Sequence, residues 1–166
     1  SMQTIINPDD LNAVEEALSL KDEYGCKVVA FTMGPMQAEP MLRELLAMGV
    51  DETVLISGRE FGGSDTYATS QIIAAAIDTY GIDDDDIIIA GRQAIDGDTA
   101  QVGPEIAAHL GIAQVTYALE VTNGSNTIIV KRSSDAGYDM VSVRKPALVT
   151  VEKPIYNPRY PSVKSK

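Results

Sequence analysis

The sequence predicts an α/β domain with a mostly parallel sheet, helices on both faces of that sheet, and an antiparallel hairpin region near the C-terminus. Helix-like and strand-like segments alternate as far as Gly111, which is the pattern of repeated β-loop-α units. The strand-like segments are apolar on both sides, as buried parallel strands are. Beyond Ala113, apolar and polar residues instead alternate, as in antiparallel strands. The chain of 166 residues suits one core, so we expect a single domain over 1–153 and a proline-rich tail over 154–166.

The first part of the chain carries clear signals for helix ends. Asn7 can cap a helix that has Pro8 at its first position, and Gly25 follows Tyr24 as a stop. Asp65 can cap a later helix after a glycine-rich loop. The expected elements are, in order, a helix over 7–24, a strand over 27–33, a helix over 36–48, a strand over 53–56, a helix over 65–80 and a strand over 87–90.

The second part begins with a helix through His109 that ends at Gly111. Two alternating segments, 115–122 and 127–132, flank Asn123-Gly124, which is a strong hairpin signal. A third antiparallel strand is expected over 138–143. The end of the chain, with prolines at 146, 154, 158 and 161, is expected to be irregular.

Composition excludes some classes of partner. The formal net charge is -11, and no stripe of Lys or Arg offsets it, so a nucleic-acid partner is not expected. No apolar run reaches the ~20 residues of a membrane helix. The start of the chain has no secretory signal, which fits a cytoplasmic or organellar-matrix location. Of these, we expect the bacterial cytoplasm. Cys26 and His109 are each the only residue of their type, and we interpret both as structural.

The segment from Gly91 to Pro104 is the best candidate for a binding site. A buried strand runs into a loop with glycines and then into a helix start, where backbone N–H groups can hold a phosphate without basic side chains. Asp98 and Gln101 have the spacing of a capping box, Gly97 permits close approach, and Asp96 could accept from ribose hydroxyls. A capped loop with no ligand explains these residues equally well.

Catalysis is not indicated by the same segment. Arg92 is the one strongly basic residue of the segment, whereas phosphoryl transfer normally needs Lys, Arg and magnesium together. The acidic run 83–86 lacks the spaced ligands of a calcium loop. We therefore expect no catalytic residue and no metal site.

A second glycine-rich turn, Phe61-Gly-Gly-Ser-Asp-Thr66, partly matches the phosphate loop of ATP pyrophosphatases. Phe61 stands where that loop has a serine, and the turn follows a later strand. A capped helix start is the better account of Ser64 and Asp65, and the pyrophosphatase remains a minor alternative. A universal-stress-like nucleotide sensor is a further alternative, although its glycine-rich phosphate signature is missing.

Several segments together carry a resemblance to a known family. The chain resembles the electron transfer flavoprotein beta subunit along nearly its whole length. The run Gln-Ala-Ile-Asp-x-Asp, followed shortly by Gln and a helix, is specific to that family. The segments that carry the resemblance are Gly91–Pro104, Asn7-Pro8, Met33-Gly34-Pro35, Ala47-Met48-Gly49 and Pro158-Arg159-Tyr160.

The resemblance implies a Rossmann-like fold of the adenine nucleotide alpha hydrolase kind and a heterodimer with an alpha subunit. It also implies electron passage through FAD from an acyl-CoA-type dehydrogenase, and an adenine nucleotide in the beta subunit. That nucleotide is AMP in many members and a second FAD in electron-bifurcating members, which exchange hydride with NADH. The residues that the resemblance places at the nucleotide are Asn7, Pro8, Asp9, Asp10, Met33, Gly91, Arg92, Gln93, Ala94, Ile95, Asp96, Gly97, Asp98, Thr99, Ala100, Gln101 and Val102.

Small side chains in the loop bear on which nucleotide is bound. Gly97 and Ala100 stand where AMP-type members tend to carry bulkier polar residues, so the comparison favours a second FAD over AMP. Two departures from the family pattern are expected. Family members begin with a hydrophobic strand, and we expect this chain to start after that strand. They also continue beyond Arg-Tyr-Pro-Ser into a loop and helix that dock the dehydrogenase.

Overall fold

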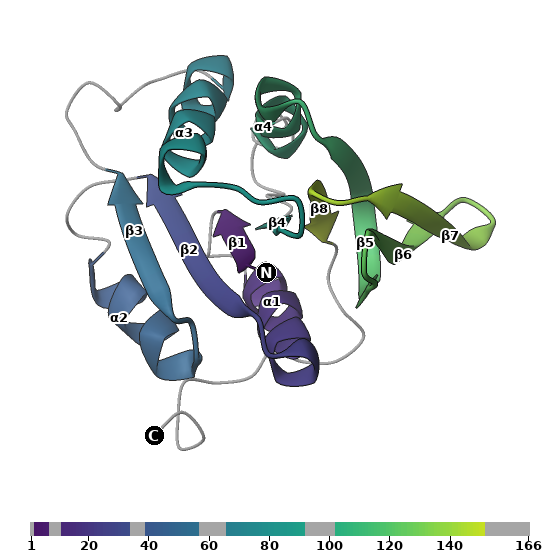
Figure 1. Ribbon diagram of the computed structural model, residues 1–166, viewed down its shortest axis with the longest axis horizontal. Helices are drawn as coiled ribbons and strands as arrows, with labels where there is room; N and C mark the ends of the chain where they lie inside the picture. Colours follow the sequence, from purple (N-terminus) through teal and green to yellow (C-terminus); the bar gives the residue numbers. More distant parts are fainter. Residues whose placement is uncertain (1, 7–10, 34–38, 57–65, 92–101, 152–166) are drawn as a thin grey trace.

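The computed structural model describes residues 2–6, 11–33, 39–56, 66–91 and 102–151, which form alternating strands and helices followed by four strands (Figure 1). In chain order these elements are β1 (Met2–Ile6), α1 (Leu11–Tyr24), β2 (Lys27–Met33), α2 (Glu39–Met48), β3 (Glu52–Ile56), α3 (Thr66–Tyr80), β4 (Ile87–Gly91), α4 (Val102–Leu110), β5 (Ala113–Asn123), β6 (Thr127–Ser134), β7 (Gly137–Arg144) and β8 (Ala147–Val151).

The strands described form one eight-stranded sheet with the order β3-β2-β1-β4-β8-β5-β6-β7. Every neighbouring pair from β3 to β5 is parallel, and the pairs β5–β6 and β6–β7 are antiparallel. The register shifts twice within β5, so its first half pairs with β8 and its second half continues with β6. The α/β class, the mostly parallel sheet and the antiparallel region near the C-terminus are therefore confirmed.

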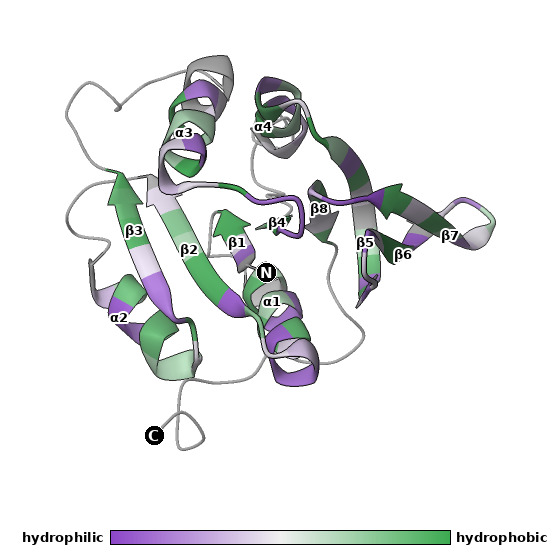
Figure 2. Cartoon of the chain, in the orientation of Figure 1, coloured by the Kyte–Doolittle hydropathy of each residue, from purple (hydrophilic) through white to green (hydrophobic). Residues whose placement is uncertain are grey.

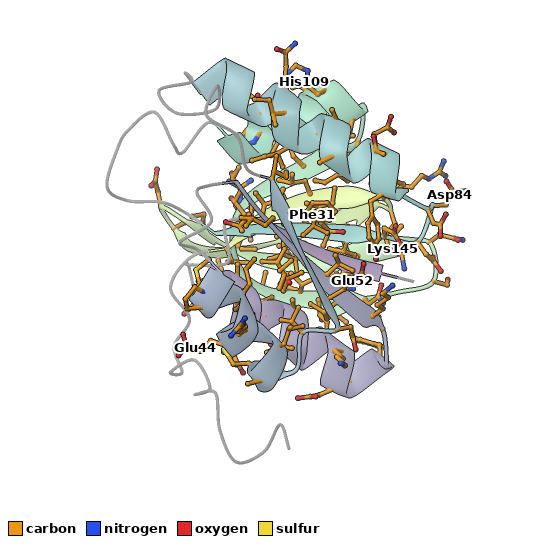
Figure 3. All side chains as sticks on the ribbon, turned by 90° about the vertical axis from the view of Figure 1, so that its left-hand side faces the viewer. Phe31, Glu44, Glu52, Asp84, His109 and Lys145 are labelled. Atoms are coloured by element: carbon orange, nitrogen blue, oxygen red, sulfur yellow. The ribbon has the colours of Figure 1, made fainter. Side chains whose placement is uncertain are left out.

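Two helices cover each face of the parallel strands. Alternate residues of each buried strand point to opposite faces. Ile5 and Ile89 pack in a cluster with apolar residues of α1 and α2, whereas Ile6 and Ile88 pack in a second cluster with α3 and α4. Figure 3 shows the sheet between the two helical layers, and in Figure 2 β2 is apolar along most of its length. This double cover explains why the strands read as unbroken apolar runs.

Most expected elements form close to their expected bounds. The first helix ends at Tyr24, and Gly25 follows with a φ of 76°, a left-handed conformation that favours glycine after a helix. The hairpin forms around Asn123-Gly124, and the third antiparallel strand follows as β7. The expected helix starts at residues 7, 36 and 65 and the tail over 154–166 lie outside the described residues.

Two strands differ from the expectations. The strand β8 follows Pro146, is buried throughout and lies between β4 and β5, whereas the region after Pro146 was expected to be irregular. The expectation that no strand precedes the first helix is also wrong, because Met2–Ile6 is a central strand of the sheet. Its apolar pattern is interrupted by Gln3 and Thr4, which are 0% and 1% exposed, so the usual signal of a buried strand is weak there.

A buried lysine links the hairpin turn to the segment that precedes β4, at the end of the sheet where the parallel strands begin. The Lys145 ammonium donates to Asn123 Oδ1 and to the carbonyl oxygen of Gly124, both at 2.8 Å, and lies 3.3 Å from a carboxylate oxygen of Asp85. The Lys145 side chain is 2% exposed, whereas that of Asp85 is 57% exposed. Lys145, Asp84 and Glu52 lie toward the same end of the sheet in Figure 3, which is where the parallel strands begin.

Replacing Lys145 with methionine is expected to lower the free energy of unfolding by about 2 kcal/mol, because two hydrogen bonds from a charged donor are lost while the aliphatic part still packs. Urea denaturation at neutral pH measures the change. The matched control is Lys27→Met, where the exposed ion pair with Glu52 is expected to contribute less than about 1 kcal/mol. Equal losses in the two variants would contradict the structural role of Lys145.

Candidate functional site

The strand order changes direction beside β1, which is where open α/β sheets form a ligand-binding crevice at their carboxyl edge. From β1 the chain continues to β2 and β3 on one side, and β4 then lies on the other side of β1. Ile6, the last residue of β1, pairs with Ala90, which precedes the end of β4 at Gly91. In open α/β sheets, ligands bind outside the carboxyl ends of the strands at such a switch point.

The two segments that the sequence singles out leave the sheet at this crevice. The segment 7–10 follows β1, and the segment 92–101 joins β4 to α4. Met33 ends the neighbouring strand β2, so the backbones of Met33, Gly91 and Val102 are placed at this edge. The other predicted site residues lie outside the described residues: Asn7, Pro8, Asp9, Asp10, Arg92, Gln93, Ala94, Ile95, Asp96, Gly97, Asp98, Thr99, Ala100 and Gln101.

Gly103 brings the first turn of α4 against the sheet, and the predicted site did not include it. A Cβ atom at Gly103 would lie 2.9 Å from Thr150 Cγ2 on β8, and 3.5 Å from the Cβ of Ala90 on β4. A glycine at such a position permits close packing of helix on strand, as the third glycine of dinucleotide-binding folds does. The signal was present in the sequence as Gly103-Pro104, directly after the predicted loop.

A side-chain hydrogen bond joins the starts of α3 and α4. The hydroxyl of Ser70, which is fully buried, donates to Glu105 Oε2 at 3.1 Å. Glu105 lies in the first turn of α4, where the helix dipole stabilises a negative charge. This contact fixes the direction of α4 relative to α3, and with it the direction of the N–H groups at the start of α4.

Several cations form contacts at the amino edge of the sheet, away from the crevice. Lys21 lies 2.9 Å from an Asp51 carboxylate oxygen. The Lys27 ammonium donates to the Tyr80 hydroxyl at 3.1 Å, and that hydroxyl donates to Glu52 at 2.8 Å. The hydrogen bonds with Tyr80 and Glu52 raise the pKa of Lys27. Lys27 begins β2 and Lys21 lies in the last turn of α1, so neither is placed to neutralise a ligand at the carboxyl edge.

A separate groove of about 460 Å³ lies between α1 and β5 and has an acidic lining. Glu16 on α1 is 7% exposed, and burial is the main reason that its pKa rises to about 7, with Glu120 and Glu15 adding repulsion. The backbone N–H of Val121 donates to Glu16 and opposes this rise. Three carboxylates line the groove beside one lysine, which disfavours a phosphate there. The lining residues are Glu16, Ser19, Leu20, Glu23, Leu119, Glu120, Val121 and Lys131.

Comparison with known proteins identifies the family. The model of the electron transfer flavoprotein domain matches residues 1–166. The chain belongs to the electron transfer flavoprotein family. Similar members include the acryloyl-CoA reductase electron transfer subunit gamma of Anaerotignum propionicum, which is 58% identical over 161 residues, covering 96% of this chain and 60% of that protein.

Two other electron transfer flavoprotein relatives are similar over the same share of the chain. The electron transfer flavoprotein subunit beta of Clostridium acetobutylicum is 56% identical over 160 residues, covering 96% of this chain and 61% of that protein. The caffeyl-CoA reductase-Etf complex subunit CarD of Acetobacterium woodii is 50% identical over 161 residues, with the same coverage of 96% and 61%. The chain thus spans about three-fifths of the length of these relatives.

The described ranges contain neither a membrane-spanning helix nor a cluster of metal-binding side chains. None of the helices in those ranges is long and apolar enough to cross a bilayer. No cluster of three or more His, Cys, Asp or Glu residues that could hold a metal ion occurs among the same residues. Cys26 is 5% exposed, and its thiol lies 3.7 Å from the carbonyl oxygen of Leu20, as befits a structural residue.

Proposed function

We propose that this chain is the part of an electron transfer flavoprotein beta subunit that binds an adenine nucleotide at the crevice between β1 and β4. The observation that carries the proposal is the strand order, which reverses where β1 and β4 end side by side. The start of α4 is held against β4 and β8 by Gly103 at the same place. The two segments that hold most of the predicted site residues, 7–10 and 92–101, follow β1 and β4 at this point.

The start of α4 supports the proposal of an adenine nucleotide. A helix N-terminus supplies unpaired N–H groups and a positive partial charge, which is what a chain of net charge -11 needs to hold a phosphate. The residues that would hold the nucleotide are the seventeen named from the sequence, together with Gly103. Their role is to bind and orient the nucleotide, because no acid, base or nucleophile is required of them.

The nucleotide that we favour is FAD, as a second flavin of the heterodimer, over AMP. Gly97 and Ala100 leave room in the loop, and two of the relatives are named as subunits of CoA-ester reductase systems. When bound, FAD supplies a ring that can take up a hydride from NADH and release electrons singly. The partners in this proposal are an alpha subunit and an acyl-CoA-type dehydrogenase, and the location is the bacterial cytoplasm.

Cofactor extraction from the purified heterodimer tests the proposal. We expect two FAD per heterodimer and no AMP, measured by chromatography of the nucleotides released by acid. One FAD with one AMP would retain the nucleotide site and reject the second flavin. A heterodimer with one FAD and no further adenine nucleotide would contradict the proposed function.

A further inference from the structure

The last strand of the sheet, β7, exposes apolar side chains on one face. Tyr138 and Met140 are 61% and 65% exposed, the two largest values among the exposed large apolar side chains described, and Ile129 on β6 is exposed as well. The register of β6 and β7 places all three on the face opposite to the buried Val130. The cluster that packs on α3 and α4 includes no described residue of these two strands. In Figure 1 β7 extends to the right, beyond the four helices.

The outer edge of β7 is unpaired among the strands that the structure describes. The backbone N–H of Lys145 donates to the carbonyl oxygen of Asn126, which fixes the hydrogen-bonding phase of β6 and β7. Residues of an antiparallel pair alternate between those bonded to the partner strand and those facing away from it. The residues of β7 whose backbone groups face outward are therefore Tyr138, Met140, Ser142 and Arg144. Their side chains lie on the exposed face, so the free edge and this face form one surface.

The strand β7 lacks the features that usually protect an edge strand, such as a bulge, a proline or an inward charge. It has eight residues, no proline and an unbroken register with β6. Its one carboxylate, Asp139, lies opposite Arg132 on the other face. An open edge beside an exposed apolar patch is typical of a surface that another chain covers.

Charge indicates which kind of chain fits this surface. Arg144 is exposed and forms none of the ion pairs found among the described residues, whereas Lys131 lies 3.9 Å from Glu120 on β5. Neither β6 nor β7 places a carboxylate on the exposed face. A two-fold dimer apposes a surface with itself, so a second copy would supply no carboxylate and would join two chains of net charge -11. A different chain, with apolar side chains and a carboxylate, is complementary.

We propose that the free edge of β7 docks an extended strand of the partner subunit. This strand continues the sheet by pairing with the outward backbone groups of Met140 and Ser142. It places apolar side chains beside Tyr138 and Met140, and a carboxylate beside Arg144. Strand addition of this kind gains affinity from backbone hydrogen bonds and specificity from alternate side chains. The inference rests on the proposed function, since the partner is the alpha subunit, and it uses no residue of the nucleotide crevice.

Sedimentation velocity of this chain with its alpha subunit, over a dilution series, tests the inference. Met140→Lys is expected to weaken association at least about tenfold, because it places a charge in the apolar contact. Ser142→Pro should weaken association by a similar factor, since it removes an outward N–H but no bond to β6. Met140→Leu should associate as the unaltered chain does. Leu46→Lys is the matched control, because Leu46 is an exposed apolar residue on α2.

The other outcomes can be told apart. A heterodimer that forms equally well with Met140→Lys and Ser142→Pro would overturn the inference alone, as would equal weakening by Leu46→Lys. If the unaltered chain bound no alpha subunit, the inference and the proposed heterodimer would both fail. A dimer of this chain by itself that Met140→Lys dissociates would identify a second copy as the occupant and overturn the inference. Circular dichroism verifies folding, and Met140→Lys decides if Ser142→Pro does not fold.

Discussion

Replacing Gly103 with leucine is expected to weaken nucleotide binding about a hundredfold. A Cβ at this position would lie 2.9 Å from Thr150 Cγ2, so the first turn of α4 must move away from β4 and β8. The N–H groups at the start of α4 would move with it, and the loss of two charge-assisted hydrogen bonds accounts for the factor. Overpacking should also lower the free energy of unfolding by about 1–3 kcal/mol.

The matched control for this change is Ala108→Leu, which adds the larger side chain at an exposed position of the same helix. Isothermal titration with AMP and with FAD measures binding, and urea denaturation measures stability. The control should bind both nucleotides as the unaltered protein does. Full binding by a folded Gly103→Leu variant would show that the start of α4 does not contact the nucleotide.

Replacing Glu16 with glutamine is expected to stabilise the protein above pH 7. Burial raises the pKa of this carboxyl from 4.5 to about 7, so the folded state holds its proton more tightly than the unfolded state does. The resulting stabilisation is fully present below pH 4.5 and is lost as the pH rises through about 7. A difference of this size corresponds to about 3 kcal/mol, which glutamine would retain at pH 8.

Urea denaturation at pH 4.5 and at pH 8 measures this effect. The two proteins should be nearly equally stable at the lower pH, and the variant should be more stable at the higher pH. Glu44→Gln removes a negative charge at an exposed position on α2 (Figure 3) and should change stability by less than about 0.5 kcal/mol. Equal gains from both substitutions at pH 8 would attribute the effect to net charge instead of to the burial of Glu16.

Most of the fold could be predicted because local signals and burial agree. Gly25 ends α1 where the apolar period of that helix ends, and Asn123-Gly124 separates two segments that alternate. The strands β1 and β8 could not be predicted in the same way. Gln3 and Thr4 interrupt the first, and Pro146 directly precedes the second. Both strands are specified by their neighbours in the sheet. The strand β1 lies between β2 and β4, and β8 is buried throughout between β4 and β5.

The candidate site could be predicted only in part. The loop after β4 is recognisable because its glycines and capping residues are consecutive in the chain. Gly103-Pro104 is visible directly after that loop, but the close packing of Gly103 against Thr150 becomes apparent only in the structure.

The central claim is that the nucleotide binds at the switch point between β1 and β4. Hydrogen exchange of the backbone amides, with and without saturating FAD, tests it most directly. We predict slower exchange at the start of α4, at the amides of Val102, Gly103 and Glu105, and at the ends of β1 and β4. No slowing at these ends, or slowing confined to the groove between α1 and β5, would contradict the claim.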